Sequence, residues 1–539
     1  MDVKEILNFC IGKGILLDKE VLKLFQETKD FDSVKLILEK IMEHTHNRLI
    51  TKDIFQENKE KVTKFFSDLP SNKQEKLEEL KIKLGLRIEI SRKKTNILNH
   101  TSKKIIQTKN FDSDNSLNEI KVFPYDTTPK EKIEVKDFVK HYVNRFCRLR
   151  DILKESPELN NLISINKISG TRQTNSIIGI VYDKKITKNK NILLEVEDLT
   201  GKIRVLITQN RPDTYEKAEE IALDSVIGFR GSGNRDVFFV NEVVFPDIMN
   251  PERKKSSVEE HVLFISDIHV GSKLFLEDNF LKFIDYLNGK IPNTPDFDKI
   301  KYLFVVGDLV AGVGIYPNQE RELEIKDIEG QYSRVAELFS KIRKDIKLII
   351  LPGNHDCVRL MEPQPVLDER YAWPLYNLKN AVFTTNPSMV NIGAKKDFSG
   401  FNVLSYHGFS FPYYANTIPS LISADAINSP IKIMKYLLKN RHLAPTHSSA
   451  QYYPSEKDSL LINEVPDIFV SGHIHKSAVA YHNNILVISN SCWEHLTSFQ
   501  EKMGNKPDFC KVPLFNLKTR QVKILDFYDD GEKENENRN

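Results

Sequence analysis

The chain has 539 residues, 40% of them hydrophobic, which suffices for about three or four domains with large cores. The 78 Lys and Arg residues nearly balance 75 Asp and Glu, and the net charge of +3 excludes a chain-wide cationic surface, so any contact with nucleic acid must come from local patches. Five Cys residues without a C-x-x-C pair argue against a disulfide framework and against a zinc ribbon. They favour a reducing compartment.

No apolar run approaches the ~18 residues of a membrane span. The acidic start MDVKEILNFC is also unlike a signal peptide. A cytoplasmic protein without a membrane partner is therefore expected.

Residues 1–60 contain short amphipathic patterns, such as the apolar positions from Val34 to Ile41, and predict a small helical module. Residues 61–130 are charged and polar without a sustained period, which is typical of a flexible tether. The basic cluster between Arg92 and Lys104 either contacts DNA phosphates or is part of a solvated linker.

Residues 131–170 begin with a helical stripe from Val135 to Leu149. Over residues 171–250 the period changes, and short runs such as SIIGIVY and KIRVLIT, separated by turn residues, predict a small closed barrel. The stretch EDLTGKIRVLI resembles an OB-fold, a barrel often used on single-stranded nucleic acid. A barrel that only joins domains is equally compatible, because stacking aromatics are not evident on these strands.

Over residues 258–530 apolar strands alternate with helical stretches, which predicts an α/β domain. Five of the strands are followed by candidate metal ligands or their neighbours: Asp267 and His269; Asp308; Asn354, His355 and Asp356; His407; His473 and His475. Strand ends meet at one edge of a sheet, and residues at i and i+2 project to the same side of extended backbone, so these side chains are expected to converge. Mixed carboxylate, imidazole and amide donors suit manganese, iron, zinc or magnesium.

The series D-I-H, G-D, G-N-H-D, Y-H-G and G-H-I-H resembles the calcineurin-like metallophosphoesterase superfamily. Stretches such as MEPQPVLDE, LLKNRHLAPTHSS and SCWEHLTSFQEKMGNKPDFCKVPLFNLKT resemble the small subunit of archaeal family D DNA polymerase. This resemblance implies an α/β, two-sheet phosphoesterase domain preceded by an OB-fold and a small helical domain. One departure is the segment Phe411, Pro412 and Tyr413, where a D-D pair is common in the family.

The resemblance also implies two divalent metal ions, with manganese favoured and Asp308 bridging. Asp267, His269, Asp308 and His475 would hold one ion, and Asp308, Asn354, His407 and His473 the other. His355 would stabilise the transition state or protonate the leaving oxygen, with Asp356 orienting it. The implied reaction is 3′ to 5′ hydrolysis of single-stranded DNA ends during proofreading. The implied partners are primer-template DNA and a large catalytic subunit that performs synthesis, in a nucleoid-associated location.

Two other functions are compatible with the sequence. The site residues suit a metallophosphoesterase that acts on another phosphate ester, and the domain order suits a non-catalytic scaffold subunit of the polymerase. The complete set of ligands argues against the scaffold. Near the motifs, a group of aromatic residues either stacks on DNA bases or packs in the core: Tyr371, Trp373, Tyr376, Tyr413 and Tyr414.

Overall fold

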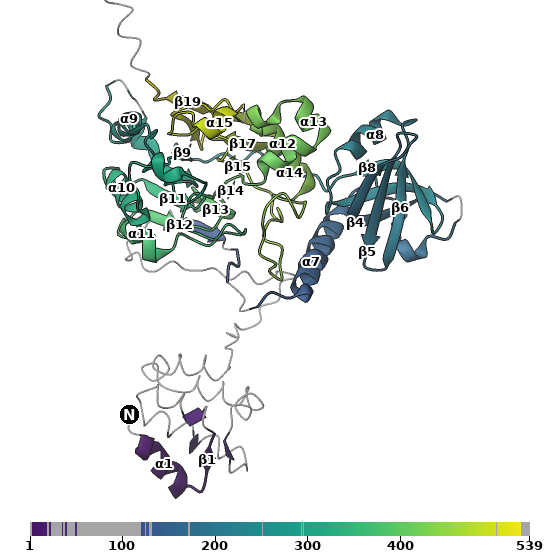
Figure 1. The fold of residues 1–539 in the computed structure, drawn as a ribbon, viewed down its shortest axis with the longest axis horizontal. Helices are drawn as coiled ribbons and strands as arrows, with labels where there is room; N and C mark the ends of the chain where they lie inside the picture. The colour runs from purple at the N-terminus through teal and green to yellow at the C-terminus, as the bar shows by residue number, and fades with distance from the viewer. Residues whose placement is uncertain are drawn as a thin grey trace, which may run out of the picture. The chain divides into compact units, whose positions relative to one another are not determined.

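The computed structural model describes residues 120–529 except 124, 129–131, 171–172, 251, 293, 295 and 503, and before them 3–18 and a few positions up to 50. The chain divides into two compact units, residues 1–102 and 103–539 (Figure 1). The described elements of the first unit are α1 (Val3–Gly12) and two parallel strands, β1 (Leu16–Leu17) and β2 (Leu49–Ile50). Most of the predicted helical module and the basic cluster between Arg92 and Lys104 lie outside the described residues.

In the second unit, five strands form a closed barrel in the order β4-β5-β6-β8-β7. These strands are β4 (Asn175–Ile186), β5 (Ile192–Asp198), β6 (Gly201–Ile207), β7 (Val226–Gly233) and β8 (Val237–Val244). Alternate side chains such as Val196, Val205 and Phe238 point inward and are fully buried, as the period of a strand requires. Helix α8 (Pro212–Glu219) joins β6 to β7. This architecture is consistent with the expected OB-fold.

Two six-stranded sheets make up the rest of the second unit (Figure 1). The first has the order β12-β11-β10-β9-β18-β19 and the second β16-β17-β15-β14-β13-β3. The first sheet contains β9 (His261–Ile265), β10 (Ile300–Val306), β11 (Lys347–Leu351), β12 (Ala381–Phe383), β18 (Lys511–Asn516) and β19 (Val522–Asp526). The second contains β3 (Lys121–Phe123), β13 (Ser388–Ile392), β14 (Phe401–Ser405), β15 (Ile468–Ser471), β16 (Ala478–His482) and β17 (Ile485–Ser489).

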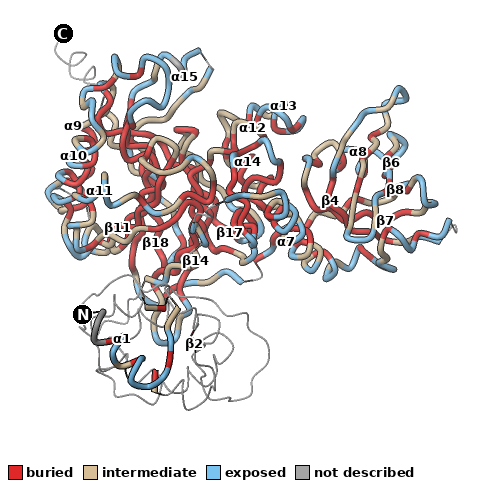
Figure 2. Tube along the Cα trace, turned by 60° about the horizontal axis from the view of Figure 1, so that its bottom comes forward, coloured by how far each residue is buried: buried red, intermediate tan, exposed pale blue. Residues whose placement is uncertain are grey.

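The central strands are buried on both faces, which explains their continuous apolar sequences. On β9, Phe264 packs between the two sheets, whereas Leu263 packs against helices on the outer face. Those helices are α9 (Glu277–Leu287), α10 (Ile328–Ser340) and α11 (Glu369–Tyr376). On the second sheet the corresponding helices are α12 (Phe411–Thr417), α13 (Pro419–Ser423) and α14 (Pro430–Asn440). Figure 2 shows the buried tube running through both layers, so the predicted two-sheet α/β fold is confirmed.

Strand β3 lies within the segment that the sequence assigned to the tether, residues 61–130. It pairs antiparallel with β13, and Val122 and Phe123 pack against the domain cores. Residues 121–123 therefore belong to the second sheet and not to a tether. The prediction overextended it because the apolar residues of the short run IKVF are surrounded by charged and polar sequence.

Helix α7 (Val135–Leu153) precedes the barrel and contacts the two-sheet domain through a buried ion pair. Arg145 is 1% exposed, and its Nε donates to Asp458 Oδ2 over 2.6 Å. His442 Nε2 lies 2.9 Å from the same carboxylate oxygen, and the backbone N–H of His447 donates to Asp224 Oδ2, next to the barrel, over 2.9 Å. These contacts join the helix, the barrel and the two-sheet domain.

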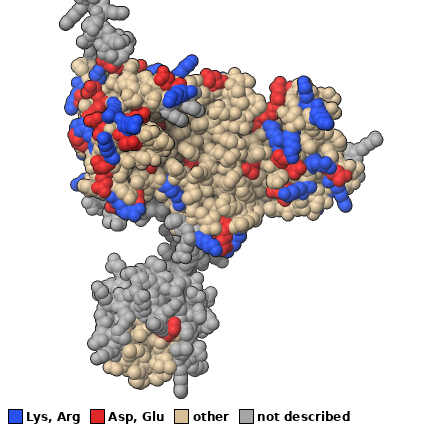
Figure 3. Space-filling model, in the orientation of Figure 1, with Lys and Arg blue, Asp and Glu red and all other residues tan. Residues whose placement is uncertain are grey.

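Figure 3 shows cationic and anionic side chains intermixed on the barrel, at the right, and on the left side of the two-sheet domain, with a broad region of other residues between them. This mixture agrees with the balanced composition and shows no extended basic face in that view. Among the described helices, none is long and apolar enough to cross a bilayer.

Candidate metal centre

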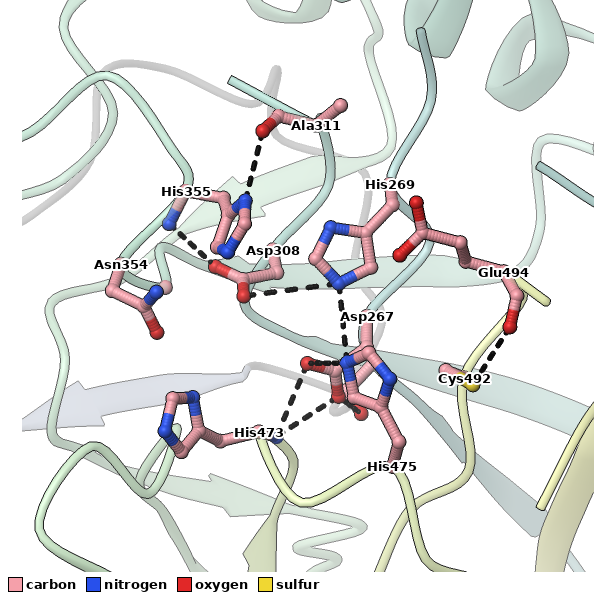
Figure 4. A network of polar contacts seen from close by, with 12 residues as sticks. Asp267, His269, Asp308, Ala311, Asn354, His355, His473, His475, Cys492 and Glu494 are labelled. Carbon is pink, nitrogen blue, oxygen red and sulfur yellow. Dashed lines mark hydrogen bonds and ion pairs between the residues drawn. The ribbon is translucent and has the colours of Figure 1, made fainter. Parts of the chain in front are cut away.

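The predicted ligands follow strands β9, β10, β11, β14 and β15, whose carboxyl ends meet at one edge of the two sheets. Three groups of donors each have ligand atoms within 4.8 Å of one another: Asp267, His269 and His475; His269, Asp308 and His355; Asp308, His407 and His473 (Figure 4). Asn354 Oδ1 lies 3.1 Å from His407 Nε2. All seven predicted ligand side chains are therefore brought together, and their roles as ligands stay a prediction.

The backbone at these positions is not extended, contrary to the reasoning behind the i, i+2 spacing. Asp267, His269, Asp308, His473 and His475 have φ values of 52°, 54°, 51°, 68° and 57°. This left-handed region costs roughly 1–2 kcal/mol for a residue other than glycine. The side chains reach the centre because each chain segment turns sharply after its strand.

Hydrogen bonds across the centre hold these turns. The backbone N–H of His355 donates to Asp308 Oδ1 over 2.8 Å, and that of His473 donates to Asp267 Oδ2 over 3.0 Å. Gly353 lies so close to the centre that a Cβ on it would sit 2.2 Å from Asp308 Oδ1. The chain therefore needs a glycine at 353 to let the loop approach the Asp308 carboxylate.

The charges of the cluster fit a divalent cation. Burial alone would raise the pKa of Asp308, but the charge of His407 holds it well below its usual range. Burial would likewise lower the pKa of His407, yet Asp308 raises it to about 9. Burial lowers the pKa of His269 and His473 to about 3, so both imidazoles are neutral and able to coordinate. His407, with its raised pKa, must release its proton before it can coordinate. Carboxylates and neutral imidazoles together are a donor set for borderline or hard divalent ions.

Contacts behind the imidazoles orient them. His407 Nδ1 donates to the Val306 carbonyl oxygen over 2.9 Å, which turns Nε2 toward Asp308. The side-chain amide of Gln500, on α15 (Ser498–Lys502), lies 2.8 Å from His475 Nδ1. Such outer partners fix the ring and the tautomer of a ligand histidine. Gln500 lies in the stretch SCWEHLTSFQEK, which the sequence marked only as a family resemblance, without a role for any of its residues.

Comparisons with known proteins agree with this geometry. Residues 260–477 match the calcineurin-like phosphoesterase family. The DNA polymerase II small subunit of Methanothermobacter thermautotrophicus is 37% identical over 398 residues, which cover 73% of this chain and 80% of the relative. That of Thermoplasma acidophilum is 32% identical over 449 residues, which cover 80% of this chain and 88% of the relative. This chain belongs to the DNA polymerase II small subunit family.

Another member, from Pyrococcus furiosus, is 36% identical over 406 residues, and the match spans only 64% of its length. Membership confirms the resemblance to archaeal polymerase small subunits and the phosphoesterase domain. A solved archaeal phosphodiesterase covers 49% of this chain at 12% identity and a TM-score of 0.25, which is too low to support an argument.

His355 and Asp356, predicted as a catalytic pair, have separate surroundings in this family member. His355 Nδ1 donates to the Ala311 carbonyl oxygen over 2.8 Å, so Ala311 makes the orienting contact predicted for Asp356. The Asp356 carboxylate accepts from the backbone N–H groups of Gly353 and Leu309, over 2.8 Å and 3.2 Å. Burial and the charge of Asp308 raise the pKa of Asp356 to about 7. Asp356 therefore braces two loops of the centre.

Most of the predicted aromatics pack in the protein. Tyr414 is fully buried and donates to Ser449 Oγ over 2.9 Å, and Tyr376 stacks on Phe383 with ring centroids 4.1 Å apart. Trp373 is 52% exposed, and Tyr371 and Tyr413 are partly buried. At the departure from the family pattern, Phe411 is fully buried at the start of α12, so this segment has a packing role.

Proposed function

We propose that this chain carries a two-metal 3′–5′ exonuclease that removes nucleotides from single-stranded DNA ends, in a polymerase whose large subunit performs synthesis. The observation that carries the proposal is the convergence of three donor groups linked through Asp308 and His269. Two cations that share one carboxylate suit in-line hydrolysis of a phosphodiester. The relatives are named DNA polymerase II small subunit, which supports the polymerase context and a larger partner subunit. DNA as the substrate of hydrolysis is part of the proposal.

The residues divide into two coordination sets around the shared carboxylate. One comprises Asp267, His269, Asp308 and His475, and the other Asp308, Asn354, His407 and His473. Manganese is favoured, and magnesium, iron and zinc are compatible with these donors. Bound divalent ions would activate a water molecule and neutralise the developing charge on the phosphate oxygens.

His355 is the proposed acid of the reaction. Because its Nδ1 is hydrogen-bonded to the Ala311 carbonyl, Nε2 is left for the substrate. Its ring centroid lies 4.7 Å from that of His269, so Nε2 borders the centre. From this position His355 donates a hydrogen bond or a proton to the leaving 3′-oxygen.

The experiment incubates the purified full chain with manganese and 5′-labelled single-stranded DNA. We expect a ladder of products shortened from the 3′ end. Asp308→Asn abolishes this ladder yet still co-purifies with the large subunit. Asp397→Asn, a matched change of an exposed acid in the same domain, leaves it unchanged.

Wild-type digestion by Asp308→Asn would refute the proposal. A preference of the wild-type chain for p-nitrophenyl phosphate over DNA would favour a phosphoesterase with another substrate. Assembly with the large subunit without any hydrolysis would favour a scaffold.

A further inference from the structure

The loop from Ala311 to Gln319, called the apolar loop below, exposes three apolar side chains. Val313 is 48% exposed, Ile315 39% and Tyr316 37%. Single exposed apolar residues are ordinary on a protein surface. Several on one short loop beside a candidate active site indicate a surface that contacts a ligand.

The apolar loop adjoins His355. Its first residue, Ala311, accepts the hydrogen bond from His355 Nδ1 (Figure 4). A Cβ placed on Gly312 would lie 2.5 Å from the carbonyl oxygen of His355 and 2.8 Å from Ile315 Cγ1. The Ile315 side chain therefore lies near the backbone carbonyl of His355.

The Tyr316 hydroxyl donates to Glu322, whose backbone carbonyl accepts from the N–H of Lys273, four residues after His269. Burial, the hydrogen bond to Glu322 and the charge of Glu494 together raise the pKa of Tyr316. Figure 4 shows Glu494 beside His269 and His475. The apolar loop therefore lies next to the chain segment that follows His269, as well as next to His355.

Two buried glutamines hold the apolar loop in place. Gln319, 2% exposed, donates through Nε2 to the Ala311 carbonyl over 2.8 Å and accepts through Oε1 from the Ile315 N–H over 2.9 Å. Gln331, fully buried, accepts from the Gly312 N–H over 2.9 Å. The Tyr316 hydroxyl donates to Glu322 Oε2 over 2.7 Å, which fixes its ring. A surface ordered in advance loses little entropy when a ligand binds.

We propose that the apolar loop is a base-binding wall, on which Tyr316 stacks with an unpaired nucleobase while Val313 and Ile315 pack against it. The inference rests on the proposed function, because the base belongs to the DNA strand whose phosphodiester lies at Asp308 and His355. A charged phosphate group does not bind favourably to an apolar surface. Every base, in contrast, has an apolar face that stacks on aromatic rings irrespective of sequence. A base still stacked in a duplex is not free to bind there, so the wall selects frayed ends.

The test compares two single-stranded oligonucleotides that differ only in whether their last two 3′ nucleotides carry bases or are abasic. With the wild-type full chain and manganese, we expect a KM about tenfold lower for the complete oligonucleotide, at similar kcat, from one base stacked on an aromatic ring. Tyr316→Ala removes this difference, whereas Tyr316→Phe retains it because the ring remains. Tyr182→Ala, at a 57% exposed tyrosine of the barrel, is the matched control and keeps the wild-type difference.

Equal KM values of the wild-type chain for the two oligonucleotides would overturn the inference and leave the proposed function intact. An undiminished preference of the double variant Ile315→Ser, Tyr316→Ala for the complete oligonucleotide would also overturn the inference. Failure of the wild-type chain to cleave either oligonucleotide would refute the proposed function and this inference with it. Unchanged melting temperatures of the variants show that a lost preference does not come from unfolding.

Discussion

Substitution of Gly353 by alanine tests whether Asp308 is the centre of the site. A Cβ at this position would lie 2.2 Å from Asp308 Oδ1, 2.6 Å from the Asp308 backbone N and 2.8 Å from His407 Cε1. Ordinary contacts begin at 3.4 Å, so the carboxylate or the loop must move by about 1 Å. A displacement of that size in a catalytic site costs on the order of a hundredfold in rate. Overpacking itself destabilises by about 1–3 kcal/mol.

We therefore expect Gly353→Ala to fold and to lose about two orders of magnitude of manganese-dependent digestion of single-stranded DNA, together with manganese affinity measured by calorimetry. Gly201→Ala is the matched control, since its Cβ would meet Ile165 Cγ2 at 3.7 Å, an ordinary contact. It should keep full activity. Wild-type digestion and manganese affinity in Gly353→Ala would show that the position of Asp308 does not matter for the chemistry.

Two further predictions concern the ion pair between α7 and the phosphoesterase. Arg145→Met leaves the Asp458 carboxylate buried without its guanidinium partner, so the free energy of unfolding, measured in urea, should fall by about 3–5 kcal/mol. Adding Asp458→Asn to this variant should restore part of the loss. Arg370→Met, at an exposed ion pair, should have no resolvable effect, and an equal loss there would contradict the reasoning. Burial and the charge of Arg145 lower the pKa of His442 from 6.5 to about 4. Between pH 6.5 and pH 4 the unfolded chain therefore binds one proton more at this residue than the folded chain, and the free energy of unfolding should fall by on the order of 3 kcal/mol as the pH drops across this range. Urea titrations should show a weaker dependence of the free energy of unfolding on pH in His442→Gln. Identical pH dependences in the two proteins would contradict this prediction.

The candidate site could be located from the sequence because its donors follow apolar strands in a fixed order. Strands β9, β10 and β11 are parallel neighbours, so their carboxyl ends had to meet. The reason given for the D-x-H and H-x-H spacing was nevertheless wrong. Asp267 and His475 adopt left-handed turns, and a left-handed φ at a residue other than glycine is not encoded in a local pattern.

Contacts that join distant segments could not be predicted. Gln500 reaches His475 from a short helix in a stretch that resembles the family but contains no ligand pattern. Ala311 acts through its carbonyl group, which any residue type provides. Strand β3 forms only because the edge of β13 accepts it. A strand of three residues is not stable by itself, so only the surrounding charged sequence could be interpreted, and it predicted a tether.

The strained backbone bears on the choice between a catalytic subunit and a scaffold. Five residues of the centre, among them Asp308 and His473, hold left-handed conformations that an ordinary turn would avoid or assign to glycine. Roughly 1–2 kcal/mol for each must be offset by the rest of the fold. A scaffold gains nothing from this cost, since glycine, or asparagine at less strain than histidine, would relax the same turns. Other described residues, such as Lys190 and Arg441, also have left-handed φ values, but five of them at one centre, with their side chains directed to one point, are expected of a site that uses those side chains. The backbone therefore supports a catalytic site over a scaffold.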